Sequence, residues 1–137
     1  MTGSTIISLF EQVAQRHPDQ TAIIAQQCQL TFNEVSLRTN QLASWLLTEA
    51  QQTDRLTADS TIALCMERSE WTLLSMLAVL KAGAAYVPID PEYPLQRKAH
   101  ILTDSRSQIV LCDTDNANRL RQDSALNNFT IIRCIIS

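Results

Sequence analysis

The feature that most limits the possible folds of this chain is an apolar helix that leads directly into an apolar strand. Trp71–Leu80 is apolar on nearly every side, which is the pattern of a helix that neighbouring elements cover all round. Ser69 stands at the N-cap position, and Glu70 places a negative charge where the helix dipole favours it. Gly83 follows where helices often need a left-handed residue, and Ala84–Val87 has the pattern of a buried strand. A buried helix and a buried strand joined through one glycine predict the middle of a βαβ unit.

The rest of the chain alternates between helical and strand patterns. Helices are predicted over 5–16, from about 31 to 47, over about 94–104 and over 118–126, and strands over 21–25, 29–32, 61–66, 108–112 and 129–136. Residues 48–60 have no apolar period and predict a surface loop. This order predicts an α/β fold, a mostly parallel sheet with flanking helices and right-handed crossovers.

Several side chains are expected to hold these helices in place. Thr31 and Glu34 form the pattern of a capping box, and Leu30 with Val35 fits the hydrophobic staple that accompanies one. One face of the first helix carries Ile6, Leu9, Phe10, Val13 and Ala14 at helical spacing. The inward positions of the two later helices are predicted to be Val35, Leu42, Ala43 and Leu46, and then Leu95, Ala99 and Leu102.

Charge and hydropathy exclude two classes of partner. The net charge of −3 leaves no basic patch for nucleic acid phosphates. The N-terminal residues lack the basic run of a signal peptide, and Lys81 interrupts the longest apolar stretch well short of the roughly 20 residues of a membrane helix. We therefore expect a cytoplasmic protein with no nucleic acid and no membrane partner.

Glycine content limits the nucleotide chemistry. Average usage of about 7% predicts roughly ten glycines in a chain of this length. This sequence has two, Gly3 and Gly83. A phosphate-cradling loop needs several glycines close together so that backbone N–H groups can approach the anion. We expect no such loop in these residues.

The histidines, serines and acidic residues give weak signals for chemistry. His17 precedes a proline at a helix end, and His100 lies on a charged helix face with Arg97 and Lys98, so a structural or solvated role is favoured for both. Asp113 and Asp115 follow a strand, at the edge where open α/β sheets bind ligands. A metal site or an acid–base pair is conceivable there, but such carboxylates are more often turn formers. Ser69 and Ser105 have no paired histidine in view, so nucleophilic catalysis has no support.

The four cysteines, Cys28, Cys65, Cys112 and Cys134, are widely spaced. A disulfide framework or a zinc site is possible on count alone, but the spacing supports neither. Cys65 and Cys112 lie inside predicted strands, where a thiol behaves as a small hydrophobic group.

Four segments of the chain stand out as ordered motifs. They are Leu80–Asp90 with the Pro-Glu-Tyr-Pro that follows it at 91–94, the Phe-Glu at 10–11 through the Pro-Asp at 18–19, the Leu-Thr-Phe-x-Glu-Val at 30–35 and the Asn-x-Leu-Ala at 40–43. They resemble the adenylation domains of nonribosomal peptide synthetases, which belong to the AMP-forming ligase superfamily, and the segment at 80–94 gives the strongest resemblance. The resemblance covers roughly residues 9–112, and the connection at 48–60 departs from the shorter, glycine-containing one usual in the family.

The resemblance implies a parent enzyme that forms an aminoacyl-adenylate from an amino acid and ATP with magnesium, and then transfers it to a carrier-protein thiol. The family's phosphate loop, substrate pocket and C-terminal lid come later than these segments. Residues 1–137 are thus expected to be a partial adenylation domain, arising from a truncated reading frame, a split protein or an excised piece. Lys81 and Tyr86 belong to the motif in a structural role, and no catalytic, cofactor-binding or metal-binding residue is assigned.

Two alternatives remain open at this point. One is a non-catalytic remnant that acts as a binding or dimerisation module through an unfinished sheet edge. The other is a fragment of an acyl-CoA ligase, which the run at 86–94 makes less favoured. The expected partner is the remainder of the adenylation domain or a second copy of the chain.

Overall fold

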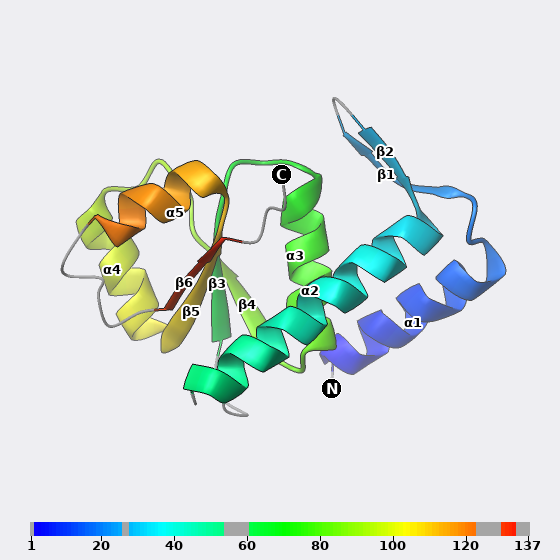
Figure 1. Ribbon diagram of the computed structural model, residues 1–137, viewed down its shortest axis with the longest axis horizontal. Helices are drawn as coiled ribbons and strands as arrows, with labels where there is room; N and C mark the ends of the chain where they lie inside the picture. Colours follow the sequence, from blue (N-terminus) through cyan, green and yellow to red (C-terminus); the bar gives the residue numbers. More distant parts are fainter. Residues whose placement is uncertain (1, 26–27, 54–60, 123–129, 134–137) are drawn as a thin grey trace.

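The computed structural model describes residues 2–25, 28–53, 61–122 and 130–133 (Figure 1). The described helices are α1 (Thr2–Arg16), α2 (Phe32–Thr53), α3 (Glu70–Lys81), α4 (Leu95–Asp104) and α5 (Thr114–Arg121). The described strands are β1 (Thr21–Ala25), β2 (Cys28–Thr31), β3 (Thr61–Cys65), β4 (Ala85–Pro88), β5 (Ser107–Cys112) and β6 (Thr130–Arg133). No helix in these ranges is long and apolar enough to cross a lipid bilayer.

A parallel sheet forms the centre of the molecule. Its strand order is β4-β3-β5-β6, and each neighbouring pair is parallel. In the register, Ile62 of β3 lies between Tyr86 of β4 and Ile109 of β5. The predicted α/β fold with a mostly parallel sheet and flanking helices is confirmed.

Alternate residues of the central strands face two different helical layers (Figure 1). Ile62 and Leu64 of β3 pack with α2 and α3, in a cluster that includes Leu46 and Val79. Ala63 of β3 and its neighbours on the opposite face pack with α4 and α5, and that cluster contains Cys65, Val110, Cys112, Leu102, Ala117 and Leu120. Burial on both faces explains why these strands are continuously apolar rather than alternating.

Helix α3 and the strand that follows it, β4, lie where the sequence predicted them. The Ser69 hydroxyl accepts a hydrogen bond from the Trp71 backbone N–H at 3.2 Å, and Thr72 Oγ1 accepts one from the Ser69 backbone N–H at 3.3 Å. Gly83 has a φ of +85°, so it takes the left-handed conformation expected after a helix. Pro88 closes β4 at the edge of the sheet, where the N–H that proline lacks is not needed for pairing.

β1 and β2 form a second, two-stranded sheet that packs against α2 and α3. β1 and β2 pair antiparallel, and Ile23, Leu30, Val35 and Leu74 form its buried cluster. The predicted capping box is present, because the Thr31 N–H donates to Glu34 Oε1 at 3.0 Å and the Glu34 N–H donates to Thr31 Oγ1 at 3.1 Å. The turn between the two strands lies outside the described residues.

Two predicted helix boundaries were wrong by four residues or more, and α1 begins at Thr2 instead of Thr5. α2 continues to Thr53 instead of ending near Leu47, because residues 48–53 contain good helix formers and neither glycine nor proline. α5 begins at Thr114 instead of Asn118, because Asp113 caps it. The predicted ends of that helix and of the last strand, at 123–126, 129 and 134–136, lie outside the described residues.

The burial of the two flanking helices also differs from the sequence pattern. On α4, Leu102 is buried and Ala99 packs against the core as predicted, but Leu95 is exposed because it begins the helix. On α1, Ala14 is buried and Phe10 is half-buried, whereas Ile6, Leu9 and Val13 are exposed.

Candidate functional site

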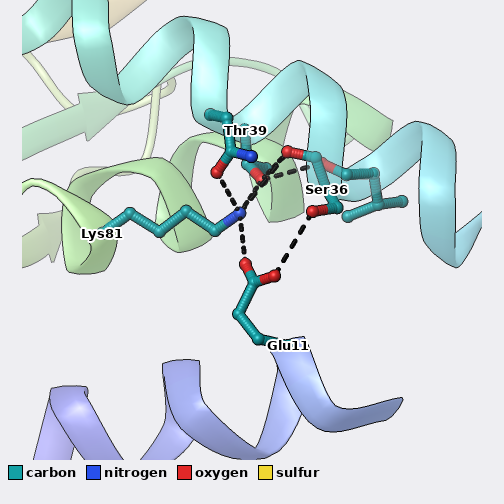
Figure 2. A network of polar contacts seen from close by, with 6 residues as sticks. Glu11, Ser36, Thr39 and Lys81 are labelled. Atoms are coloured by element: carbon teal, nitrogen blue, oxygen red, sulfur yellow. Dashed lines mark hydrogen bonds and ion pairs between the residues drawn. The ribbon is translucent and has the colours of Figure 1, made fainter. Parts of the chain in front are cut away.

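The most connected polar group in the described residues is the ammonium of Lys81, at the end of α3 (Figure 2). It makes an ion pair with Glu11 Oε1 of α1 at 2.9 Å. It also donates to Thr39 Oγ1 and to Asn40 Oδ1 of α2, both at 2.8 Å. One lysine therefore joins three helices that are far apart in the sequence.

The surroundings of this ammonium complete a small network. Ser36 Oγ donates to the second carboxylate oxygen of Glu11 at 3.5 Å, and the Phe10 ring lies 5.3 Å from the Lys81 nitrogen. Thr39 Oγ1 donates in turn to the Val35 carbonyl at 2.7 Å. The Lys81 side chain is only 7% exposed, so its three N–H donors are taken up by three side-chain oxygens. An ammonium held in this way serves to position helices, in agreement with the structural role expected for Lys81.

The sequence contained a signal for this network that pattern analysis did not use. Glu11, Asn40 and Lys81 lie in three of the segments that resemble adenylation domains. Nothing in helical spacing shows that they meet, because the contact depends on how α1 and α2 cross α3. Joint membership of family motifs was the available clue.

The carboxyl edge of the sheet carries the acidic residues that were candidates for chemistry. Asp113, after β5, is the N-cap of α5, and its Oδ1 accepts from the backbone N–H and side-chain N–H of Asn116 at 3.0 and 2.8 Å. Its Oδ2 accepts from the Glu67 backbone N–H at 2.9 Å, which ties the loop after β3 to the start of α5. Asp90, after β4, accepts from the Glu92 N–H at 2.9 Å.

Asp113 is therefore a turn former, as the sequence favoured. Asp115 lies exposed in the first turn of α5, where its charge suits the helix dipole. Across the described ranges, no group of three or more His, Cys, Asp or Glu side chains is placed to hold a metal ion.

The buried cysteines behave as small hydrophobic groups. Cys65 and Cys112 lie buried in β3 and β5, and neither they nor Cys28 forms a disulfide. Burial raises the pKa of the Cys65 thiol, the nearby Lys98 lowers it, and Asp113, Asp90 and Glu67 raise it further. The thiol is therefore protonated at neutral pH, the form that is a poor nucleophile. Cys134 lies outside the described residues.

The other candidates occupy structural or solvated positions. His17 and His100 are exposed. Ser69 caps α3, and the Ser105 hydroxyl shares a hydrogen bond of 2.8 Å with the Ser107 hydroxyl. Tyr86 is half-buried and packs against the core between the sheet, α2 and α3.

Lys98 was placed wrongly by the sequence pattern. It was assigned to the solvated face of α4 with Arg97 and His100, but it is only 3% exposed. It stands four residues before the buried Leu102, so both project from the same side of the helix. The helical spacing did carry a signal, because Lys98 stands three residues after Leu95 and four before Leu102, both of which were predicted to face inward.

Comparison with known families gives a match over almost the whole chain. The sequence profile of the family described as AMP-binding enzyme matches residues 10–136.

Individual relatives point to large peptide synthases. One of the subunits of linear gramicidin synthase from Brevibacillus parabrevis is 44% identical over 110 residues, which is 80% of this chain and 1% of that protein. One of the subunits of mycosubtilin synthase from Bacillus subtilis is 41% identical over 122 residues, or 89% of this chain and 4% of that protein. Tyrocidine synthase 1 from Brevibacillus parabrevis is 45% identical over 109 residues, 80% of this chain and 10% of that protein. The chain thus spans a small part of the length of each.

Solved structures show the same fold at lower identity. A nonribosomal peptide synthetase structure, FmoA3 bound to α-methyl-L-serine-AMP, superposes with a TM-score of 0.80 at 24% identity, covering 93% of this chain and 14% of that one. An artificially fused adenylation–PCP di-domain from Klebsiella oxytoca, NpsA-ThdA, has a TM-score of 0.73 at 23% identity, covering 94% and 22%.

Proposed function

Because this chain belongs to the AMP-binding enzyme family, we propose that it is the N-terminal structural segment of an enzyme that activates an amino acid with ATP. The product is an aminoacyl-adenylate for nonribosomal peptide synthesis. The observation that carries the proposal is the identity with peptide synthases across four fifths or more of the chain. The same relatives favour this parent over an acyl-CoA ligase.

The role of the segment in that enzyme is to build one end of the parallel sheet and to fix the helices around it. The Lys81 ammonium fixes α1 and α2 to the end of α3. β4 and β6 lie at the two edges of the described sheet, so each has one side without a neighbouring strand. We infer that the partner for these edges is the remainder of the adenylation domain.

The described residues give no support for a triphosphate site at the carboxyl edge of the sheet. The carboxyl edge of the sheet carries Glu67, Asp90 and Asp113, whose charge repels a triphosphate. Gly83 is isolated, so no nest of backbone N–H groups surrounds it. We propose that ATP and magnesium bind in the remainder of the domain, and we derive no catalytic step from this segment.

A carrier protein is proposed as a partner of the parent enzyme, with the adenylation–PCP fusion among the structural neighbours as support. We also propose a cytoplasmic location, because the proposed reaction consumes ATP, which is supplied in the cytoplasm.

Segment replacement tests the proposal. Residues 10–133 of this chain would replace the matching segment of tyrocidine synthase 1, and amino-acid-dependent exchange of pyrophosphate into ATP would be measured with a panel of amino acids. We expect the chimera to retain exchange with the amino acid preference of the unaltered synthase, because this segment supplies structure.

A matched chimera carrying Lys81→Met serves as the control, and we expect it to be less stable and less active. A chimera that unfolds cooperatively with heat, binds its amino acid and yet gives no exchange would contradict the proposal.

A further inference from the structure

A cavity unrelated to the Lys81 network lies between the first turn of α4 and the last turn of α5. Its volume is about 740 Å³, within the range of about 300–1000 Å³ typical of small-molecule sites. Its walls include Glu92, Tyr93 and Leu95 at the start of α4, together with Lys98, Arg119 and Gln122.

Lys98 is the unusual group in this wall. The residue is only 3% exposed, and its ammonium makes no direct hydrogen bond or ion pair with a residue that the structure describes. The nearest charged groups on its inner side are those around Cys65, namely Asp113, Asp90 and Glu67. A buried ammonium is costly unless an anion or several acceptors accompany it. Such a group beside an open cavity is suited to an anionic ligand.

The N-terminus of α4 adds a second attraction for anions. Its N-cap is Pro94, which offers no side-chain acceptor to the backbone N–H groups of the first turn. Uncapped N–H groups and the helix dipole together favour a negative group at this end of a helix. Leu95, in that first turn, is part of the cavity wall.

The charges around the cavity favour a doubly charged head group. Among the residues that line the cavity, Lys98 and Arg119 are cations and the exposed Glu92 is the one carboxylate. Asp90, Asp113 and Glu67 lie behind this wall, around Cys65, and offset part of the charge of Lys98. A third cation, Arg97, lies with its guanidinium 4.1 Å from the centroid of the Tyr93 ring. The Tyr93 ring and the half-exposed Leu95 provide an apolar wall beside these cations.

We propose that this cavity binds an organic phosphate, with the phosphate at Lys98, Arg119 and the first turn of α4, and with the apolar part of the ligand against Tyr93 and Leu95. The proposal concerns residues outside the sheet edges and the Lys81 network, and it does not depend on the function proposed above.

Nuclear magnetic resonance titration of the chain tests this site, with phenyl phosphate as the probe. We expect binding with a Kd of about 1 mM or tighter, with the largest amide shifts at residues 95–98 and 119–122. Inorganic phosphate should bind more weakly because it lacks the apolar part, and benzoate more weakly because it carries one charge.

Three variants connect the binding to its residues. Lys98→Met keeps the length of the side chain and should fold at least as stably, but it should weaken phenyl phosphate at least tenfold. Arg119→Gln should weaken it severalfold. Arg38→Gln, at an exposed cation on α2, is the matched control and should leave the Kd unchanged.

Several results would overturn the proposal. They are an unchanged Kd in Lys98→Met, equally tight binding of benzoate or inorganic phosphate, amide shifts that map away from α4 and α5, and no saturable binding of phenyl phosphate at all.

Discussion

Lys81 illustrates how one side chain can organise a large part of a small fold. Its aliphatic stem lies along α3 while its ammonium reaches α1 and α2, and each contact replaces water with a protein oxygen (Figure 2). Hydrogen bonds to a charged group stabilise by more than neutral ones, and their loss leaves the partners unsatisfied. The contribution of Lys81 is therefore concentrated at the place where α1 joins the rest of the molecule.

We predict that Lys81→Met destabilises the chain by about 2 kcal/mol. The variant keeps most of the apolar stem but leaves Glu11, Thr39 and Asn40 without their shared donor. Urea unfolding followed by circular dichroism measures the change. Glu11→Gln should cost less, because the Glu11 side chain is 37% exposed. A Lys81→Met midpoint equal to that of Arg68→Met, an exposed cation in the segment before α3, would contradict the network's role.

Gly83→Ala is predicted to destabilise by about 1 kcal/mol or more. No atom lies within 4 Å of the position a Cβ would take, so the cost arises from the φ of +85° alone. Gly83→Asn should lose less, since asparagine tolerates the left-handed region better than alanine does. Thermal unfolding of the three proteins gives the comparison, and equal midpoints for the unaltered chain and Gly83→Ala would show that the strain is absent.

At the scale of residues, the sequence predicted the conformations and caps that depend on nearby residues in the chain. Ser69, Gly83 and the Thr31–Glu34 box are determined by neighbours within a few positions in the chain. The sites of Lys81 and Lys98 were not predictable in the same way. Their surroundings are formed by elements distant in sequence. Because lysine is usually exposed, its burial becomes apparent only once the packing of those elements is known.

At the scale of elements, the capping box of α2 leads to a prediction about pH. The Thr31 N–H and hydroxyl lower the pKa of Glu34 below its ordinary value of 4.5, and Arg38 lowers it further. A group whose pKa is depressed by folding contributes stability above its unfolded pKa and loses it as pH falls through its folded pKa. The box should therefore stabilise α2 above about pH 4.5 and weaken below it.

Carbon-detected titration of the Glu34 carboxyl checks this expectation directly, and the midpoint should lie below 4.5. Glu34→Gln keeps an acceptor for the Thr31 N–H without a titrating proton, so this variant should lose that part of the pH dependence. A midpoint at or above the ordinary value would show that the box does not form in solution.

The order of the elements was predictable because each one has either an apolar period or a continuous apolar run bounded by polar or turn residues, but two helix boundaries were not. The end of α2 at Thr53 depends on helix formers that are equally common in loops, and the start of α5 depends on the Asp113 cap. The exposure of Ile6, Leu9 and Val13 on α1 was not predictable either, because an apolar stripe does not show what covers it.

At the scale of the whole molecule, we predict that the chain alone does not exchange pyrophosphate into ATP in the presence of amino acids. The acidic edge of the sheet and the isolated Gly83 provide no site for a triphosphate. The chimera described above is the positive control. The prediction would be contradicted if the purified chain showed exchange activity and that activity stayed with the protein through two further columns.

The last prediction concerns association between copies. β4 and β6 each lie at an edge of the described sheet, and unpaired edge strands are templates for pairing. On α1, Ile6, Leu9 and Val13 are 44%, 58% and 38% exposed, so this helix carries an exposed apolar stripe of its own. We expect the chain to form dimers or larger species in a concentration-dependent manner, which sedimentation velocity measures.

Leu9→Glu should shift the distribution towards monomer without lowering the unfolding midpoint, because this side chain supports little of the core. A monodisperse monomer at tens of micromolar would show that neither the edges nor the stripe drives association.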